Sequence, residues 1–111
     1  MPNVQQFNMN AQGGVTPEGN GALMSRTNAN NQPNQGQWHT ANKIATVKLP
    51  SAVWNVTPND GSAYAFTIQA NSSSAIISLQ TNAPLGPQIY EVETAPGVGG
   101  GNSSPSVVVE P

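Results

Sequence analysis

The sequence has no cysteine and very few charged residues, with three Lys or Arg and five Asp or Glu among 111 positions. The absence of cysteine excludes disulfides, thiolate metal ligands and thiol redox chemistry. Charged residues make up 7% of the chain, compared with about 25% in an average soluble protein. Binding to nucleic acids or anionic membranes needs several basic residues, so neither partner is expected when the only ones are Arg26, Lys43 and Lys48.

A targeting or membrane segment is not expected at the start of the chain. The first residues, MPNVQQFNMNAQGG, contain no basic start, no continuous apolar stretch and no cleavage site of the kind found in signal peptides. Synthesis in a host cytoplasm, without a signal peptide, is therefore the expectation.

The sequence also lacks a catalytic or metal-binding spacing, so no enzymatic activity, metal or cofactor is expected. A nucleophile would have to be Ser, Thr or a carboxylate working with the only histidine, His39. Glu91 and Glu93 share one face of a predicted strand. They are interpreted as part of a solvated face partnered by Lys43 or Lys48, with an acid pair or a Ca²⁺ site on a symmetry axis as the alternative.

Residues 1–37 are instead rich in Asn, Gln and Gly, with isolated apolar residues and no sustained periodicity. This composition predicts an extended polar arm that cannot bury enough apolar surface to fold alone. The apolar residues of the arm, with Trp38 at its junction, are candidate anchors that insert into grooves on a partner. These anchors are Val4, Phe7, Met9, Leu23, Met24 and Trp38.

Residues 38–94 have the pattern of an all-β domain, with short runs of β-branched and aromatic residues separated by turn sequences. Turns are expected at 58–61 (PNDG), 71–74 and 84–87 (PLGP). The predicted strands are 41–49, 52–57, 63–69, 75–81 and 88–94.

Alternation along these strands assembles one apolar face and one polar face, which predicts a small antiparallel β-sandwich or barrel. Trp54 lies on the apolar face and is expected in the core. Trp38 precedes the first strand and either pins the arm or forms an exposed platform for stacking sugars. The predicted apolar face consists of Ala45, Val47, Leu49, Ala52, Trp54, Val56, Tyr64, Phe66, Ile68, Ala75, Ile77, Leu79, Tyr90 and Val92.

The end of the sequence predicts a Gly/Ser linker over 95–105 and a tail strand over 106–111. The apolar residues of this strand, Val107, Val108 and Val109, are candidate partner-binding residues. The strand either completes its own sheet or adds to the sheet of a neighbouring subunit.

An all-β core with a neutral polar arm, a glycine-rich linker and no cysteine resembles, in layout, the small capsid decoration (cement) proteins of tailed bacteriophages. The resemblance spans the whole chain through composition and layout, so no family residue is carried over to a position here. It implies a structural virion protein outside an assembled shell that bridges neighbouring coat subunits. The implied partners are the major capsid protein or other coat subunits, and further copies of the chain, often as a trimer.

Two other functions stay open from the sequence. A receptor- or glycan-binding β module of a viral fibre or spike would use Trp38 and the loops at 57–62 and 70–74. A self-polymerising filament subunit would use the tail strand or the arm head to tail. If the arm only anchors the protein, removal of residues 1–37 should leave a folded β domain that no longer stays on its assembly.

Overall fold

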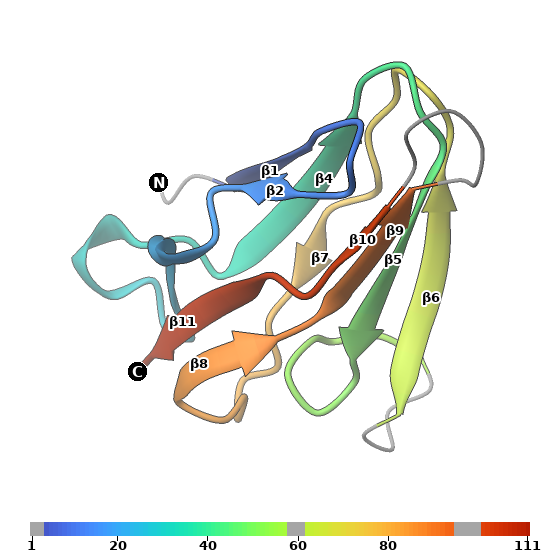
Figure 1. Cartoon of the computed structure of the whole chain (residues 1–111). Helices are drawn as coiled ribbons and strands as arrows, with labels where there is room; N and C mark the ends of the chain where they lie inside the picture. Colours follow the sequence, from blue (N-terminus) through green and yellow to red (C-terminus); the bar gives the residue numbers. More distant parts are fainter. Residues whose placement is uncertain (1–3, 58–61, 95–100) are drawn as a thin grey trace.

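The computed structural model consists of short β-strands in three sheets around one hydrophobic core (Figure 1). The structure describes residues 4–57, 62–94 and 101–111. The predicted all-β class is confirmed, and a small sandwich fits the arrangement of the sheets. The turn predicted at 58–61, and residues 1–3 and 95–100 of the predicted arm and linker, lie outside the described residues.

The first sheet shows that the predicted arm belongs to the fold. Its strands, in spatial order, are β2 (Val15–Thr16), β1 (Gln5–Met9), β4 (Gln35–Thr40) and β7 (Ile77–Ser78). β1 pairs in parallel with β4, with Phe7 opposite Trp38. Because alternate side chains of a strand face the same side, Phe7 and Met9 both point into the core and are buried. The expectation of an extended arm is therefore wrong for the described residues of this segment.

The second and third sheets contain the rest of the strands. The second sheet has the order β10 (Asn102–Ser103), β9 (Glu91–Thr94), β5 (Ala45–Pro50) and β6 (Ala63–Ile68). The third has the order β3 (Gly19–Ser25), β11 (Ser106–Glu110) and β8 (Gly86–Ile89). The tail strand β11 lies parallel to β3 and antiparallel to β8. It therefore pairs within its own chain, which decides between the two alternatives that the sequence left open.

Three predicted strands differ from the observed elements. In place of the strand predicted at 52–57, the chain makes a turn at 51–53, where Val53 and Trp54 both donate backbone hydrogen bonds to Pro50 O, at 3.1 and 3.0 Å. Trp54 then forms an isolated antiparallel bridge with Leu79. This turn exposes Ala52 and buries Val53 and Trp54, so the predicted alternation fails there. The strand predicted at 75–81 is reduced to β7, and Ala75 is exposed. The strand predicted at 88–94 is divided at Tyr90, where the chain leaves the third sheet for the second.

The described part of the predicted linker, 101–105, is ordered by a close approach of two glycines. A Cβ on Gly101 would lie 2.4 Å from Gln12 O, and one on Gly13 would lie 2.5 Å from Gly101 O. Only glycine leaves room for this contact. Ser103 Oγ also donates to Gly13 O. These contacts attach β10 to the β1–β2 turn, so this segment is structural and does not act as a linker.

An aromatic cluster forms the centre of the core. Trp38 stacks on Phe7 at 4.8 Å and meets Trp54 and Tyr90 edge to face at 5.3 and 5.6 Å. Trp38 Nε1 donates a buried hydrogen bond to Tyr90 Oη at 3.1 Å. Burial raises the pKa of the Tyr90 hydroxyl well above its ordinary value of 10. Trp38 is 0% exposed, so it cannot be the surface platform that the sequence suggested.

Candidate binding surfaces

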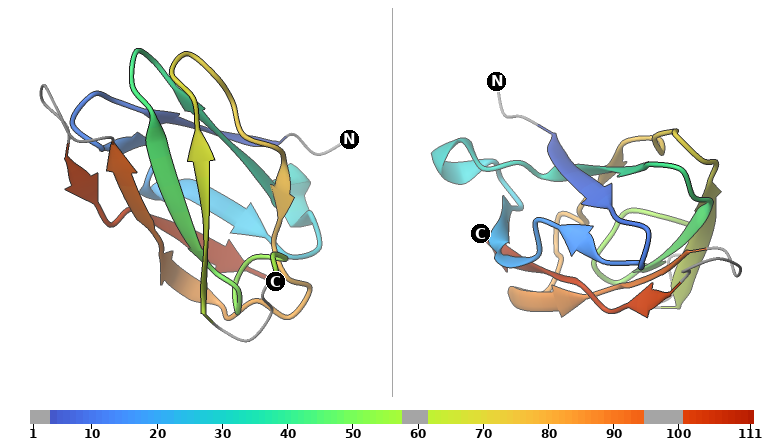
Figure 2. Two further views of the ribbon diagram at one scale, coloured as in Figure 1. Left: turned by 90° about the vertical axis from the view of Figure 1, so that its right-hand side faces the viewer. Right: turned by 45° about the horizontal axis from the view of Figure 1, so that its top comes forward.

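An open groove of about 470 Å³ lies between β6 and the segment that leads into β7, and we call it the edge groove. In Figure 2 (left), the chain turns back at the end of β6 and runs down into β7. Tyr64 and Phe66 from β6 form one wall, and Ala75 and Ile77 form the other. The remaining lining residues are Asn55, Val56, Thr57, Thr67, Ser73 and Ser74. Since none of the lining residues is charged, the edge groove suits a neutral occupant.

β6 is an outer strand of the second sheet, and its free edge forms the rim of the edge groove. Ser51 N donates to Ser62 O at 3.0 Å, immediately before β6. Since hydrogen-bonded and non-hydrogen-bonded pairs alternate in an antiparallel ladder, the backbone groups of Ala63, Ala65 and Thr67 point away from β5. No strand in the described part of the chain pairs with this side of β6.

The other sheet edges are better protected than β6. β2, β7 and β10 have two residues each. β3 has seven residues and, like β6, neither proline nor charge, but a register shift interrupts its pairing with β11. Tyr90 N donates to Pro105 O at 3.0 Å. Alternation along the ladder therefore points the backbone groups of Pro87 and Ile89 away from β11, toward the free edge of β8. Proline offers no N–H to another strand. β6 has six residues and contains neither proline nor charge, the two devices that usually block pairing at an edge.

Part of the outer face of the third sheet is apolar, and we call this part the docking face. Glu110 lies on the same face of β11, two residues from Val108, and borders it. Val108 lies opposite Leu23 on one side and Pro87 on the other, in one cross-strand row. Ile89 extends this surface along β8, with 61% of its surface exposed, and Leu85, 51% exposed, directly precedes the strand. Apolar patches that exceed a few hundred Å² on soluble monomers usually mark interaction sites, so contiguous exposed apolar residues make this face a candidate binding surface.

The structure separates the nine predicted anchors into two groups. Six are buried in the core of this chain because alternation along their strands points them inward, and they are not available to a partner in this state. These six are Phe7, Met9, Met24, Trp38, Val107 and Val109. The other three, Val4, Leu23 and Val108, are half-buried. Leu23 and Val108 are brought together on the docking face, although they are 85 positions apart in the sequence.

His39 lies on the outer face of the first sheet, where its ring nitrogens Nε2 and Nδ1 contact Gln6 Oε1 and Ser73 Oγ. The chain positions that meet here are far apart, so spacing alone gave no signal for the cluster. In a serine–histidine pair that attacks a substrate, a carboxylate usually stabilises the imidazolium, and the neutral Gln6 amide cannot do so. The contacts connect β4 to its two neighbouring segments and give no support to a nucleophilic site.

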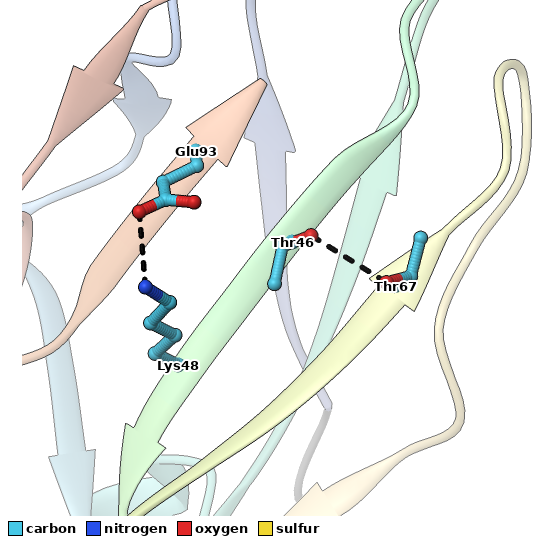
Figure 3. Close-up of polar contacts among 4 residues, drawn as sticks. All are labelled: Thr46, Lys48, Thr67 and Glu93. Atoms are coloured by element: carbon cyan, nitrogen blue, oxygen red, sulfur yellow. Dashed lines mark hydrogen bonds and ion pairs between the residues drawn. The ribbon is translucent and has the colours of Figure 1, made fainter. Parts of the chain in front are cut away.

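The outer face of the second sheet carries Lys48 and Glu93, two of the charged residues that the sequence singled out (Figure 3). Lys48 Nζ lies 3.0 Å from Glu93 Oε1, which agrees with the interpretation of Glu93 as part of a solvated, paired face. The hydrogen bond and the charge of Glu93 raise the pKa of the Lys48 ammonium. Beside this pair, Thr46 and Thr67 hydroxyls contact each other at 3.4 Å. Among residues 4–57, 62–94 and 101–111, no three His, Asp or Glu side chains gather as metal ligands do.

No protein-family model matches the chain, and neither a curated protein nor a solved structure matches it. Within the described ranges, no helix has the length and apolar character needed to cross a bilayer. Any functional conclusion therefore depends on the docking face and the edge groove.

Proposed function

We propose that this chain is a structural virion subunit of the capsid decoration type, which binds neighbouring coat subunits through its docking face. The observation that carries the proposal is the row Leu23, Val108 and Pro87 with the exposed side chains of Leu85 and Ile89 beside it. Covering Leu85 and Ile89 would each contribute on the order of 1 kcal/mol, because about half of each side chain is exposed.

The low charge of the molecule supports the same function. The net charge is −2 for 111 residues. When many copies lie close together on one shell, each unit of net charge is repelled by every near copy, so a nearly neutral surface tolerates this crowding. A sheet face is also rigid, so little conformational entropy would be lost on docking.

The test uses particles purified from the virus or host that encodes the chain. The wild-type chain should sediment with particles in stoichiometric amounts, and a Leu85→Asp, Ile89→Asp variant should be lost from them. Ile76→Asp is the matched control because Ile76 is 50% exposed, close to the 51% of Leu85, but lies outside the docking face. A chain absent from particles, or equal retention of both variants, would reject the proposal.

A glycan-binding module is the second candidate, and the edge groove is the observation that favours it. The groove combines the Tyr64 ring with the neutral side chains of Asn55 and Thr57, and sugars are typically bound by such rings and neutral polar groups. If this function holds, the wild-type chain should bind to glycans on an array, and Tyr64→Ala should lose this binding. A filament formed through the arm or tail strand has less support, because the described parts of both segments pair inside the chain.

A further inference from the structure

We propose that β6 pairs antiparallel with β6 of a second copy of this chain across a two-fold axis, so that the second sheet continues through two protomers. The surface involved is the free edge of β6, which lies on a different sheet from the docking face (Figure 1). The inference does not depend on the proposed function, because it concerns only copies of the purified chain.

The backbone of β6 is self-complementary. The outward N–H and C=O groups belong to Ala63, Ala65 and Thr67, which are spaced two apart. With Ala65 opposite its own counterpart on the axis, Ala63 lies opposite Thr67 of the second copy, and Thr67 lies opposite Ala63. All outward N–H and C=O groups of these three residues then have a hydrogen-bond partner.

The side chains of β6 fit this register on both faces of the sheet. Ala63, Ala65 and Thr67 are exposed on the outer face, and their small side chains leave room for a second strand. On the inner face, Tyr64 would lie opposite Phe66 of the second copy. Aromatic cross-strand pairs of this kind contribute about 0.5 to 1 kcal/mol each. Tyr64 and Phe66 are only half-buried in the isolated chain, and the second copy would cover them.

Charge favours a second copy of this chain over a charged partner. β6 has no charged residue, and none lines the edge groove, so two identical strands meet without like-charge repulsion. The charged residue registered against the middle of β6 is Lys48, opposite Ala65, and its ammonium is paired with Glu93. A charged peptide would gain no ion pair at this edge and would lose hydration of its own charges.

Sedimentation equilibrium of the full chain from micromolar to sub-millimolar concentration tests the pairing. The wild-type chain and the control Ala65→Ser should form dimers. Ala65→Pro removes an N–H that the monomer does not use in its own ladder, and Ala65→Glu puts two like charges opposite each other, so both should remain monomeric. Native tryptophan fluorescence confirms folding, and the glutamate variant preserves the test if the proline variant misfolds.

Cysteine crosslinking tests the register, because the natural chain has no cysteine. Directly opposite residues have Cα atoms about 5.5 Å apart, within the range that a disulfide spans. Under mild oxidation Ala65→Cys should form a covalent dimer, and Ala63→Cys alone should not. A mixture of Ala63→Cys and Thr67→Cys should crosslink. The proposal is overturned if the wild-type chain is a monomer at every concentration, or if Ala65→Cys and Ala63→Cys each crosslink to the same extent. A monomeric wild type would leave the free edge of β6 available to a strand of another protein.

Discussion

At the residue scale, the hydrogen bond from Trp38 Nε1 to Tyr90 Oη is the polar contact at the centre of the core. Tyr90→Phe would keep the ring and leave the buried indole N–H without an acceptor. We expect the free energy of unfolding to fall by about 1 to 3 kcal/mol, the usual cost of one unsatisfied buried group. Urea unfolding followed by tryptophan fluorescence measures this, and an unchanged midpoint would show that the contact contributes nothing to stability.

The same residue predicts a loss of stability in alkaline solution. Below its ordinary pKa of 10, Tyr90 is protonated in both the folded and the unfolded chain. Above that pH, the unfolded chain releases the proton while burial keeps it on the folded chain. The free energy of unfolding therefore falls as pH rises, by at most about 1.4 kcal/mol per pH unit.

Comparison with Tyr90→Phe isolates this effect, because every other titrating group is present in both proteins. The stability advantage of the wild type should shrink between about pH 9 and about pH 11. Urea titrations at several pH values provide the measurement. If the free energy of unfolding depends on pH in the same way in both proteins, Tyr90 does not titrate differently in the folded and the unfolded chain.

At the element scale, the class of the fold was predictable and the role of the N-terminal segment was not. β5 and β6 carry long alternating runs, and the strands predicted at 41–49 and 63–69 overlap them, although β5 begins only at Ala45. β1 shows the same alternation only at Phe7 and Met9, surrounded by Asn and Gln, so composition hid a buried strand. Its partner β4 lies far along the chain in a parallel pairing, and local turn signals give no information on such pairings.

The N-terminal strands therefore predict a different result for truncation than the sequence alone. Phe7 is fully buried and stacks on Trp38, so Phe7→Ala should lower the free energy of unfolding by about 3 to 5 kcal/mol. Removal of residues 1–37 takes away β1, β2 and β3 and should abolish cooperative unfolding. Thermal denaturation monitored by near-ultraviolet circular dichroism distinguishes these outcomes. A native spectrum of the truncated chain would support the original interpretation of residues 1–37 as an arm that is not needed for folding.

The contact between β10 and the β1–β2 turn predicts a steric effect at Gly101. Gly101→Ala would place a methyl group 2.4 Å from Gln12 O, which forces the backbone to move. We expect a loss of about 1 to 3 kcal/mol, as for other overpacked positions. Asn102→Ala, at the exposed neighbouring position, is the control and should stay close to wild type. If Gly101→Ala and Asn102→Ala are equally stable in urea, β10 can move away from the β1–β2 turn without lowering the free energy of unfolding.

At the scale of the whole molecule, the two proposed binding surfaces would have complementary roles. Figure 1 shows the third sheet and β6 on opposite sides of the fold. A pair joined through β6 would present two docking faces, one on each copy, and each would be available to a different neighbour. Two linked contacts dissociate much more slowly than one, so such a pair would crosslink a shell more effectively than a monomer. If the proposed docking holds, the half-buried Leu23 and Val108 would bind the partner from a sheet face in place of an arm.

Both surfaces are almost uncharged, and this predicts how association responds to salt. Neither β6 nor the row Leu23, Val108 and Pro87 contains a charged residue. Screening of charges by added salt should therefore change the dimer dissociation constant less than about threefold between low and physiological ionic strength. Sedimentation equilibrium of the wild-type chain and of the control Ala65→Ser in a sodium chloride series measures this. A steep weakening of the wild-type dimer by salt would mean that charged groups outside these surfaces hold the copies together.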